Sequence, residues 1–201
     1  MNYRKRTLLG LFAILLMLGL IALFGFRNPR NLTLDASQLL KSPDDSSEKP
    51  LSGKSVIFII APNNFRDEEL LETREIIEGY GAVSEIASTS IDTATGMLGA
   101  KIIPDGIIAD INIDEYDAFI FIGGSGATSL WNNPDALRIA KKAFDSGKVV
   151  AAICLAPVIL ARAGILKGCN ATVFPSAKNE LEKSDVKYAD EDVVICGKII
   201  T

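Results

Sequence analysis

The run Val149-Val150-Ala151-Ala152-Ile153-Cys154-Leu155-Ala156-Pro157 decides the fold of this chain. Its first five residues are all apolar, which is typical of a strand that is buried on both faces. A helix is predicted directly after the run, over residues 157–163. Cys154 therefore lies between a buried strand and a helix, which is where a G-x-S-x-G turn holds its nucleophile.

The residues on both sides of Cys154 are small. Ala152 and Ala156 stand two positions before and after it, and they meet the same steric demand as the glycines of a G-x-S-x-G turn. Such a turn would hold Cys154 in a strained backbone conformation near a helix N-terminus, whose N–H groups favour a thiolate. The alternative is a buried, inert cysteine, which is a common fate of this residue type.

From residue 54 onward the chain alternates between predicted strands and helices. Strands are predicted over residues 55–61, 83–87, 118–122, 149–153 and 171–174, and helices over residues 65–80, 134–146, 157–163 and 177–183. Asn64 is predicted to cap the first helix, residues 96–113 to form a small hairpin, and residues 193–196 to pair with residues 198–201 through Gly197. The alternation predicts an α/β fold with a doubly wound, mainly parallel sheet.

Sites in such a sheet lie at the carboxyl ends of the strands. Residues 63–69, 123–127 and 153–157 fall at such ends. The run Gly123-Gly124-Ser125-Gly126 could present backbone N–H groups to an oxyanion or a phosphate, although an ordinary glycine turn fits the same residues. Because it lies next to the predicted Cys154 turn, an oxyanion hole is the better interpretation.

The N-terminal part of the chain has a different composition. Arg4, Lys5 and Arg6 precede an uncharged stretch, residues 7–26, which is long enough to span a bilayer as a helix. We predict an uncleaved membrane anchor over residues 7–26, rather than a cleaved signal peptide, and a polar linker over residues 27–53. The positive-inside bias places the domain of this single-pass membrane protein on the extracytoplasmic side. The net charge of −4 gives no reason to expect a nucleic-acid partner.

Four groups of residues are informative in combination: Phe65-Arg66-Asp67-Glu68-Glu69, Tyr116-Asp117-Ala118 with Gly123-Gly124, the Cys154 turn, and Ala163-Gly164-Ile165-Leu166-Lys167-Gly168. The chain resembles, over residues 54–201, the ThiJ/PfpI family of the class I glutamine amidotransferase-like fold, a flavodoxin-like sandwich. The resemblance implies that Cys154 is the reactive thiol, that Glu69 is its acidic partner, and that Gly124 and Leu155 supply oxyanion-hole N–H groups. From the residues alone, Glu69 belongs to an acidic cluster that is typical of a solvated helix face.

The chain departs from that family's pattern because it contains no histidine. Leu155 stands where protease-like members carry a histidine, and Phe174 stands where the deglycase branch carries one. A Cys-His-Glu triad is therefore impossible, and amide hydrolysis lacks its general acid. The expected function is that of a membrane-anchored protein whose Cys154 reacts with small carbonyl compounds or other electrophiles, as in a glyoxalase or deglycase. The alternatives are a non-catalytic redox-sensing or binding module and, disfavoured, a PfpI-type cysteine peptidase that acts on peptides.

Further expectations concern what surrounds the site. No cofactor is expected, and no metal site either, because the sequence has no histidine and no C-x-x-C pair. Cys169 and Cys196 either form a disulfide or remain two free thiols. The resemblance also implies a final helix after residues 198–201, so the domain is expected to lack that helix. A homodimer is kept as an expectation.

Overall fold

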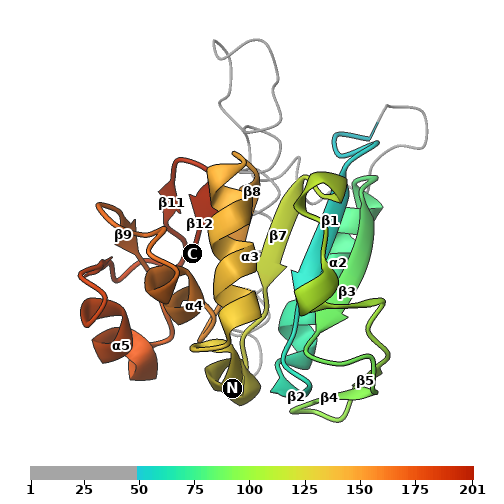
Figure 1. Cartoon of the computed structure of the whole chain (residues 1–201), viewed down its shortest axis with the longest axis horizontal. Helices are drawn as coiled ribbons and strands as arrows, with labels where there is room; N and C mark the ends of the chain where they lie inside the picture. The colour runs from blue at the N-terminus through green and yellow to red at the C-terminus, as the bar shows by residue number, and fades with distance from the viewer. Residues whose placement is uncertain (1–48) are drawn as a thin grey trace.

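A computed structural model describes residues 49–201 of the chain (Figure 1). Its strands are β1 (Ser55–Ile59), β2 (Asn63–Phe65), β3 (Val83–Ser88), β4 (Ala94–Gly96), β5 (Lys101–Ile102), β6 (Gly106–Ile107), β7 (Ala118–Phe121), β8 (Val149–Ala152), β9 (Asn170–Ala171), β10 (Lys187–Tyr188), β11 (Ile195–Cys196) and β12 (Ile199–Ile200). Its α-helices are α2 (Asp67–Gly79), α3 (Pro134–Asp145), α4 (Pro157–Arg162) and α5 (Lys178–Glu182), and its short 3-10 helices are η1 (Ile108–Asp110), η2 (Ile113–Glu115), η3 (Ser125–Leu130) and η4 (Pro175–Ala177). None of the helices within residues 49–201 is long and apolar enough to cross a bilayer, and the anchor predicted over residues 7–26 lies outside the described residues.

A seven-stranded sheet forms the centre of the domain, in the order β11-β12-β8-β7-β1-β3-β6. Neighbouring strands are parallel throughout, except that β11 is antiparallel to β12. In this sheet β3 lies on one side of β1 and β7 lies on the other. The order in which the chain adds strands therefore reverses direction at β1. Open α/β sheets bind their ligands at the carboxyl ends of the strands beside such a switch point. The predicted doubly wound, mainly parallel fold is confirmed.

The central strands are apolar throughout because both faces of the sheet are covered. In β1 and β7, Ile57 and Phe119 pack in one core, which includes residues of α3 and α4. Phe58 and Ile120, one position further along, pack in a second core, which includes residues of α2. Figure 1 accordingly shows α3 on one side of the sheet and α2 on the other.

The packed domain begins inside the segment predicted as a linker. Leu51 is 1% exposed and belongs to the same core as α2. Its N–H donates to the carbonyl of Tyr80 at 2.9 Å, just after the end of α2. The residues immediately before β1 therefore contribute to the core as well as to the connection.

The connection from β1 to α2 differs from its prediction. Asn64 does not cap the helix: α2 begins at Asp67, after Arg66, and has no side-chain cap. Asn64 lies instead in β2, with a φ of 55°, and β2 pairs with β4. The first turn of α2 carries Asp67, Glu68 and Glu69, and negative charge at this end complements the helix dipole.

The hairpin predicted over residues 96–113 is shorter and lies earlier in the chain. β4 and β5 pair antiparallel, whereas β6 joins the main sheet parallel to β3. The hairpin turns at residues 97–100 because the buried carboxylate of Asp67 accepts the N–H groups of Leu98 at 2.8 Å and Ala100 at 2.7 Å. Asp67 precedes Leu98 by 31 residues, so no local pattern predicts this turn.

The C-terminal corner is joined by a covalent bond. β11 and β12 pair around Gly197 as predicted, and Cys169 forms a disulfide with Cys196. The strand predicted over residues 171–174 is replaced by the short β9, which pairs with β10 outside the main sheet. Beyond β9, the N–H of Thr172 donates to Oγ1 of Thr201 at 3.0 Å. The disulfide and this hydrogen bond together fix residues 169–172 against the edge of the main sheet.

Candidate functional site

Cys154 lies at the carboxyl end of β8 in a left-handed backbone conformation. Its φ is 61°, which is uncommon for a residue other than glycine and costs conformational energy. Ala152 and Ala156 are fully buried on either side of it, so larger side chains have no room there. Cys154 itself is half-buried and is the one free cysteine among the described residues. The turn therefore presents a thiol at the carboxyl end of the sheet, where the loops that follow β1, β7 and β8 lie.

Glu69 and Cys154 meet at Gly123, directly after β7. The N–H of Gly123 donates to Oε2 of Glu69 at 2.9 Å, within the protein interior. A Cβ atom on Gly123 would lie 2.6 Å from Cβ of Cys154 and 2.7 Å from Oε2 of Glu69. These separations leave space for hydrogen only, so the carboxyl and the thiol can approach each other only because residue 123 is glycine. Glu69 is 4% exposed and does not lie on a solvated helix face.

The backbone N–H groups of Gly124 and Leu155 lie near the thiol of Cys154 and act to lower its pKa. Gly124 has a φ of 89°, and a Cβ atom there would lie 2.5 Å from the carbonyl oxygen of Asn64. The β2 segment thus packs directly on the glycine loop, and the N–H of Arg66 donates to the carbonyl of Gly123 at 3.1 Å. The two residues predicted for an oxyanion hole therefore lie together at the thiol.

Burial and the neighbouring backbone N–H groups act in opposite directions on the pKa values of this pair. Desolvation by burial raises the pKa of Glu69 to about 7, although the Gly123 N–H and the Cys154 thiol act to lower it. Burial and the Glu69 carboxylate raise the pKa of Cys154 to about 12, against the lowering effect of the Gly124 and Leu155 N–H groups. The N–H groups act in the predicted direction, but they do not make Cys154 a thiolate while Glu69 is ionised. The two groups titrate as a pair, and transfer of the proton from sulfur to carboxylate creates the nucleophile.

Two aromatic residues attach the Cys154 turn to its surroundings. The N–H of Phe174 donates to the carbonyl of Cys154 at 2.7 Å, and the Phe174 side chain is 53% exposed. Nε1 of Trp131 donates to the carbonyl of Leu155 at 2.9 Å, and the Arg162 guanidinium lies 5.3 Å from the centre of the Trp131 ring. Phe174 thus contacts the backbone of Cys154, and its side chain cannot transfer a proton.

The structure brings together all four residues predicted for the site: Cys154, Glu69, Gly124 and Leu155. Two further residues of the site were not predicted from the sequence: Gly123, through its steric role, and Met97, whose thioether accepts the N–H of Ser125 at 3.4 Å. Two consecutive glycines, Gly123 and Gly124, could have indicated the steric role of Gly123, because such a pair is typical of a close approach between segments. Nothing in the local sequence around Met97 indicated its contact with Ser125, because Met97 reaches the glycine loop from a separate hairpin.

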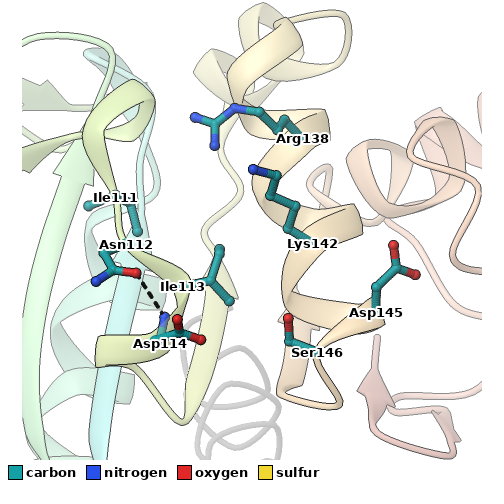
Figure 2. A pocket seen from close by; sticks show the side chains of 8 residues that line it. All are labelled: Ile111, Asn112, Ile113, Asp114, Arg138, Lys142, Asp145 and Ser146. Carbon is teal, nitrogen blue, oxygen red and sulfur yellow. Dashed lines mark hydrogen bonds between the residues drawn. The ribbon is translucent and has the colours of Figure 1, made fainter.

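A cavity of about 420 Å³ lies elsewhere, and its lining includes no residue of the Cys154 site. Figure 2 shows Arg138 and Lys142 of α3 on one side of it and Asn112 and Asp114 on the other. The Arg138 guanidinium already donates to Asp135 and to the carbonyl of Ala109. Within residues 49–201, no three metal-ligating side chains converge.

The fold and the site together define a class: an α/β protein with a flavodoxin-like sheet, a half-buried thiol after a central strand, and a buried carboxyl beside it. The chain belongs to the DJ-1/PfpI family, whose model matches residues 54–201. The family proposed from the resemblance is therefore confirmed.

Individual relatives agree with this assignment. The chain is 42% identical to the protein MJ0967 of Methanocaldococcus jannaschii, over 85% of this chain and 84% of that protein. It is 34% identical to the deglycase PH1704 of Pyrococcus horikoshii, over 73% of this chain and 87% of that protein. Among solved structures, the ThiJ/PfpI domain protein of Brachyspira murdochii matches with a TM-score of 0.72 at 33% identity, over 74% of this chain and 87% of that one.

Proposed function

We propose that the protein is a deglycase-like enzyme in which Cys154 adds to small, neutral carbonyl compounds such as glyoxals. The observation that carries the proposal is the meeting of the Glu69 carboxyl and the Cys154 thiol at Gly123, where no side chain separates them. The similarity to a deglycase of Pyrococcus horikoshii supports the same class of substrate. Neutral substrates are favoured because the nearby guanidinium of Arg66 is already paired with Glu68.

Glu69 is the proton carrier in the proposed step. Its carboxylate takes the proton from the Cys154 thiol while the sulfur forms a bond to the carbonyl carbon and the carbonyl π electrons move to oxygen. The resulting alkoxide then takes the proton back from Glu69, which completes a hemithioacetal without any net change in protons. A pKa of about 7 suits this exchange, because a general acid–base works best near the ambient pH. The N–H groups of Gly124 and Leu155 are the donors available for the alkoxide.

Peptide hydrolysis is disfavoured in this proposal. The chain contains no histidine, so no imidazole is available to protonate a leaving amine, and a second copy of the chain cannot supply one. Glu69 would have to hold the thiol proton and protonate the amine as well. Addition to a carbonyl needs only the single proton exchange described above.

A redox-sensing module is the second candidate, and the exposure of the Cys154 turn favours it. The thiol is half-buried rather than enclosed, so peroxides can reach it and oxidise it to a sulfenic and then a sulfinic acid. Oxidation would occur in either case. The two candidates differ in whether a glyoxal is consumed catalytically.

The test is glyoxal consumption by the full chain kept in detergent, compared with Cys154→Ser. We expect the substitution to lower the rate by about a thousandfold or more, as removal of a nucleophile does in other enzymes. Lys141→Ala, at a half-exposed residue on α3 that pairs with Asp145, is the matched control and should keep full activity. Full activity in Cys154→Ser would exclude the proposed site. No consumption by the unsubstituted protein, together with rapid alkylation of Cys154, would favour the redox-sensing module.

Membrane attachment through residues 7–26, with the domain on the extracytoplasmic side, is part of the proposal. The basic flank and the uncharged stretch support an anchor, and the Cys169–Cys196 disulfide supports an oxidising compartment. Deletion of residues 1–26 should move the protein from the membrane fraction to the soluble fraction. If the shortened chain stays with membranes, residues 7–26 are not the anchor. A homodimer stays a prediction.

A further inference from the structure

Three consecutive backbone N–H groups of the glycine loop lie against three different side chains. The N–H of Gly123 donates to Glu69 at 2.9 Å, and that of Gly124 lies near the Cys154 thiol, whose pKa it acts to lower. The N–H of Ser125 donates to Sδ of Met97 at 3.4 Å. Two of these side chains are the proposed reacting pair. The third is a thioether, which accepts hydrogen bonds only weakly and has no acid–base chemistry.

Met97 is carried to the loop by a hairpin turn that is fixed at several points. Its own N–H donates to the carbonyl of Phe65 at 2.9 Å, which attaches the turn to β2. The buried carboxylate of Asp67 accepts the N–H groups of Leu98 and Ala100 on either side of the turn. A Cβ atom on Gly96 would collide with that carboxylate, so the turn closes tightly around it. The backbone of Met97 is therefore held beside the glycine loop by contacts other than the bond to its own sulfur.

The contact with Ser125 bears directly on the thiol. Ser125 follows Gly124, and a glycine at a φ of 89° gives the loop conformational freedom at the residue whose N–H faces the sulfur. A constraint on the next N–H limits rotation of the Gly124–Ser125 peptide. We propose that Met97 is a positioning residue of the Cys154 site, which holds the glycine loop so that the Gly124 N–H points at the sulfur. The inference rests on the proposed reactivity of Cys154.

The test compares three variants of the full chain in detergent by the rate of Cys154 alkylation with iodoacetamide across a range of pH. Met97→Leu keeps an apolar side chain of similar size but removes the acceptor. We expect it to slow alkylation about two- to threefold, the low end of the range for one hydrogen bond because a thioether is a weak acceptor, and to move the pH profile upward because the Gly124 N–H lowers the pKa of Cys154. Met97→Gln restores an acceptor and should bring the rate and the profile back. Leu98→Ala, on the same turn with a side chain that is 61% exposed, should leave both unchanged.

A second measurement separates this inference from the proposed function. Hydrogen–deuterium exchange of the peptide that covers residues 121–127 should be faster in Met97→Leu than in the unsubstituted protein and Met97→Gln, whether or not glyoxals are consumed. Faster exchange without glyoxal consumption would remove the proposed function and leave Met97 as a residue that positions the loop. Unchanged exchange and an unchanged pH profile in Met97→Leu would overturn the inference, as would equal effects of Met97→Leu and Leu98→Ala.

Discussion

The three cysteines of this chain lie in two neighbouring regions that treat sulfur in opposite ways. In the Cys154 turn, a single residue is held in a left-handed conformation, and its sulfur faces backbone N–H groups and a carboxyl. In the C-terminal corner, Cys169 and Cys196 are joined in a disulfide whose Cα atoms lie 6.0 Å apart. The Phe174 N–H connects the regions, because it donates to the carbonyl of Cys154 from the segment that follows the disulfide.

The difference between the two regions shows what keeps one thiol available while two others are oxidised. The Cys154 sulfur is positioned by its own strand and helix and by the glycine loop, all of which belong to the centre of the sheet. The other two sulfurs are positioned by segments at its edge, 27 residues apart in sequence. The first arrangement costs conformational energy and provides reactivity, whereas the second provides stability and no reactivity.

The largest expected effect is the loss of the disulfide. Replacement of both Cys169 and Cys196 by serine should lower the free energy of unfolding by about 3 to 4 kcal/mol, because the unfolded chain is no longer closed into a loop of this length. Urea unfolding of the full chain in detergent measures the change. Cys154→Gly is the matched control and should change stability by less than about 1 kcal/mol, since relief of the left-handed strain offsets the lost contacts. Equal losses in the two proteins would erase the distinction between the regions.

The second effect concerns the pH dependence of stability in the Cys154 region. The pKa of Glu69 is about 7 in the folded protein against 4.5 for the free side chain, so the folded state binds the extra proton between these values. The contribution of Glu69 to stability is therefore complete below pH 4.5 and is lost as the pH rises through 7. In Glu69→Gln this loss is absent, while the amide oxygen can still accept the Gly123 N–H.

Urea unfolding of both proteins at pH 4 to 8 tests this prediction. The difference in unfolding free energy between the original protein and Glu69→Gln should change by about 2 to 3 kcal/mol across the range. The comparison of two proteins cancels the contributions of other carboxylates, such as Glu78 and Glu180, whose lowered pKa values act in the opposite direction. A difference that is independent of pH would mean that Glu69 is not buried beside the thiol as described.

The smallest effect is at the support of the Cys154 turn. Trp131→Phe removes the Nε1 donor to the Leu155 carbonyl but keeps the ring that faces Arg162, and we expect a loss of about 1 kcal/mol. Arg162→Gln leaves the indole N–H in place but also breaks the ion pair with Glu180 and the hydrogen bond to Asn132, so we expect it to cost more stability than Trp131→Phe. Thermal unfolding measures both variants. If Trp131→Phe leaves stability unchanged, that hydrogen bond does not hold the turn.

Much of the fold was predictable because it depends on local properties of the chain. The apolar strands β1, β7 and β8, the helices between them and the turn at Gly197 follow from composition and spacing. The errors occurred where a distant residue decides the local structure. Asn64 was predicted as a cap but lies in β2, and the hairpin turns at residues 97–100 because Asp67 binds its N–H groups.

The site divides in the same way. Cys154 was recognisable from its small neighbours, whereas Glu69 looked like one carboxylate in an acidic cluster and needed the resemblance to a family to be singled out. Its burial, its contact with Gly123 and its raised pKa arise only when α2 packs against the ends of β7 and β8. Met97 had no signal at all, because its role requires the separate β4–β5 hairpin to reach the glycine loop.

The sequence by itself determined the parallel α/β sheet, the thiol at the end of β8 and the absence of any imidazole partner, because strand burial, small flanking residues and composition are all local properties. The tertiary structure alone decided which carboxyl meets that thiol, which N–H groups face the sulfur, and that Cys169 joins Cys196. These depend on distances between segments far apart in the chain, and such distances are set only when the two cores on either side of the sheet pack together.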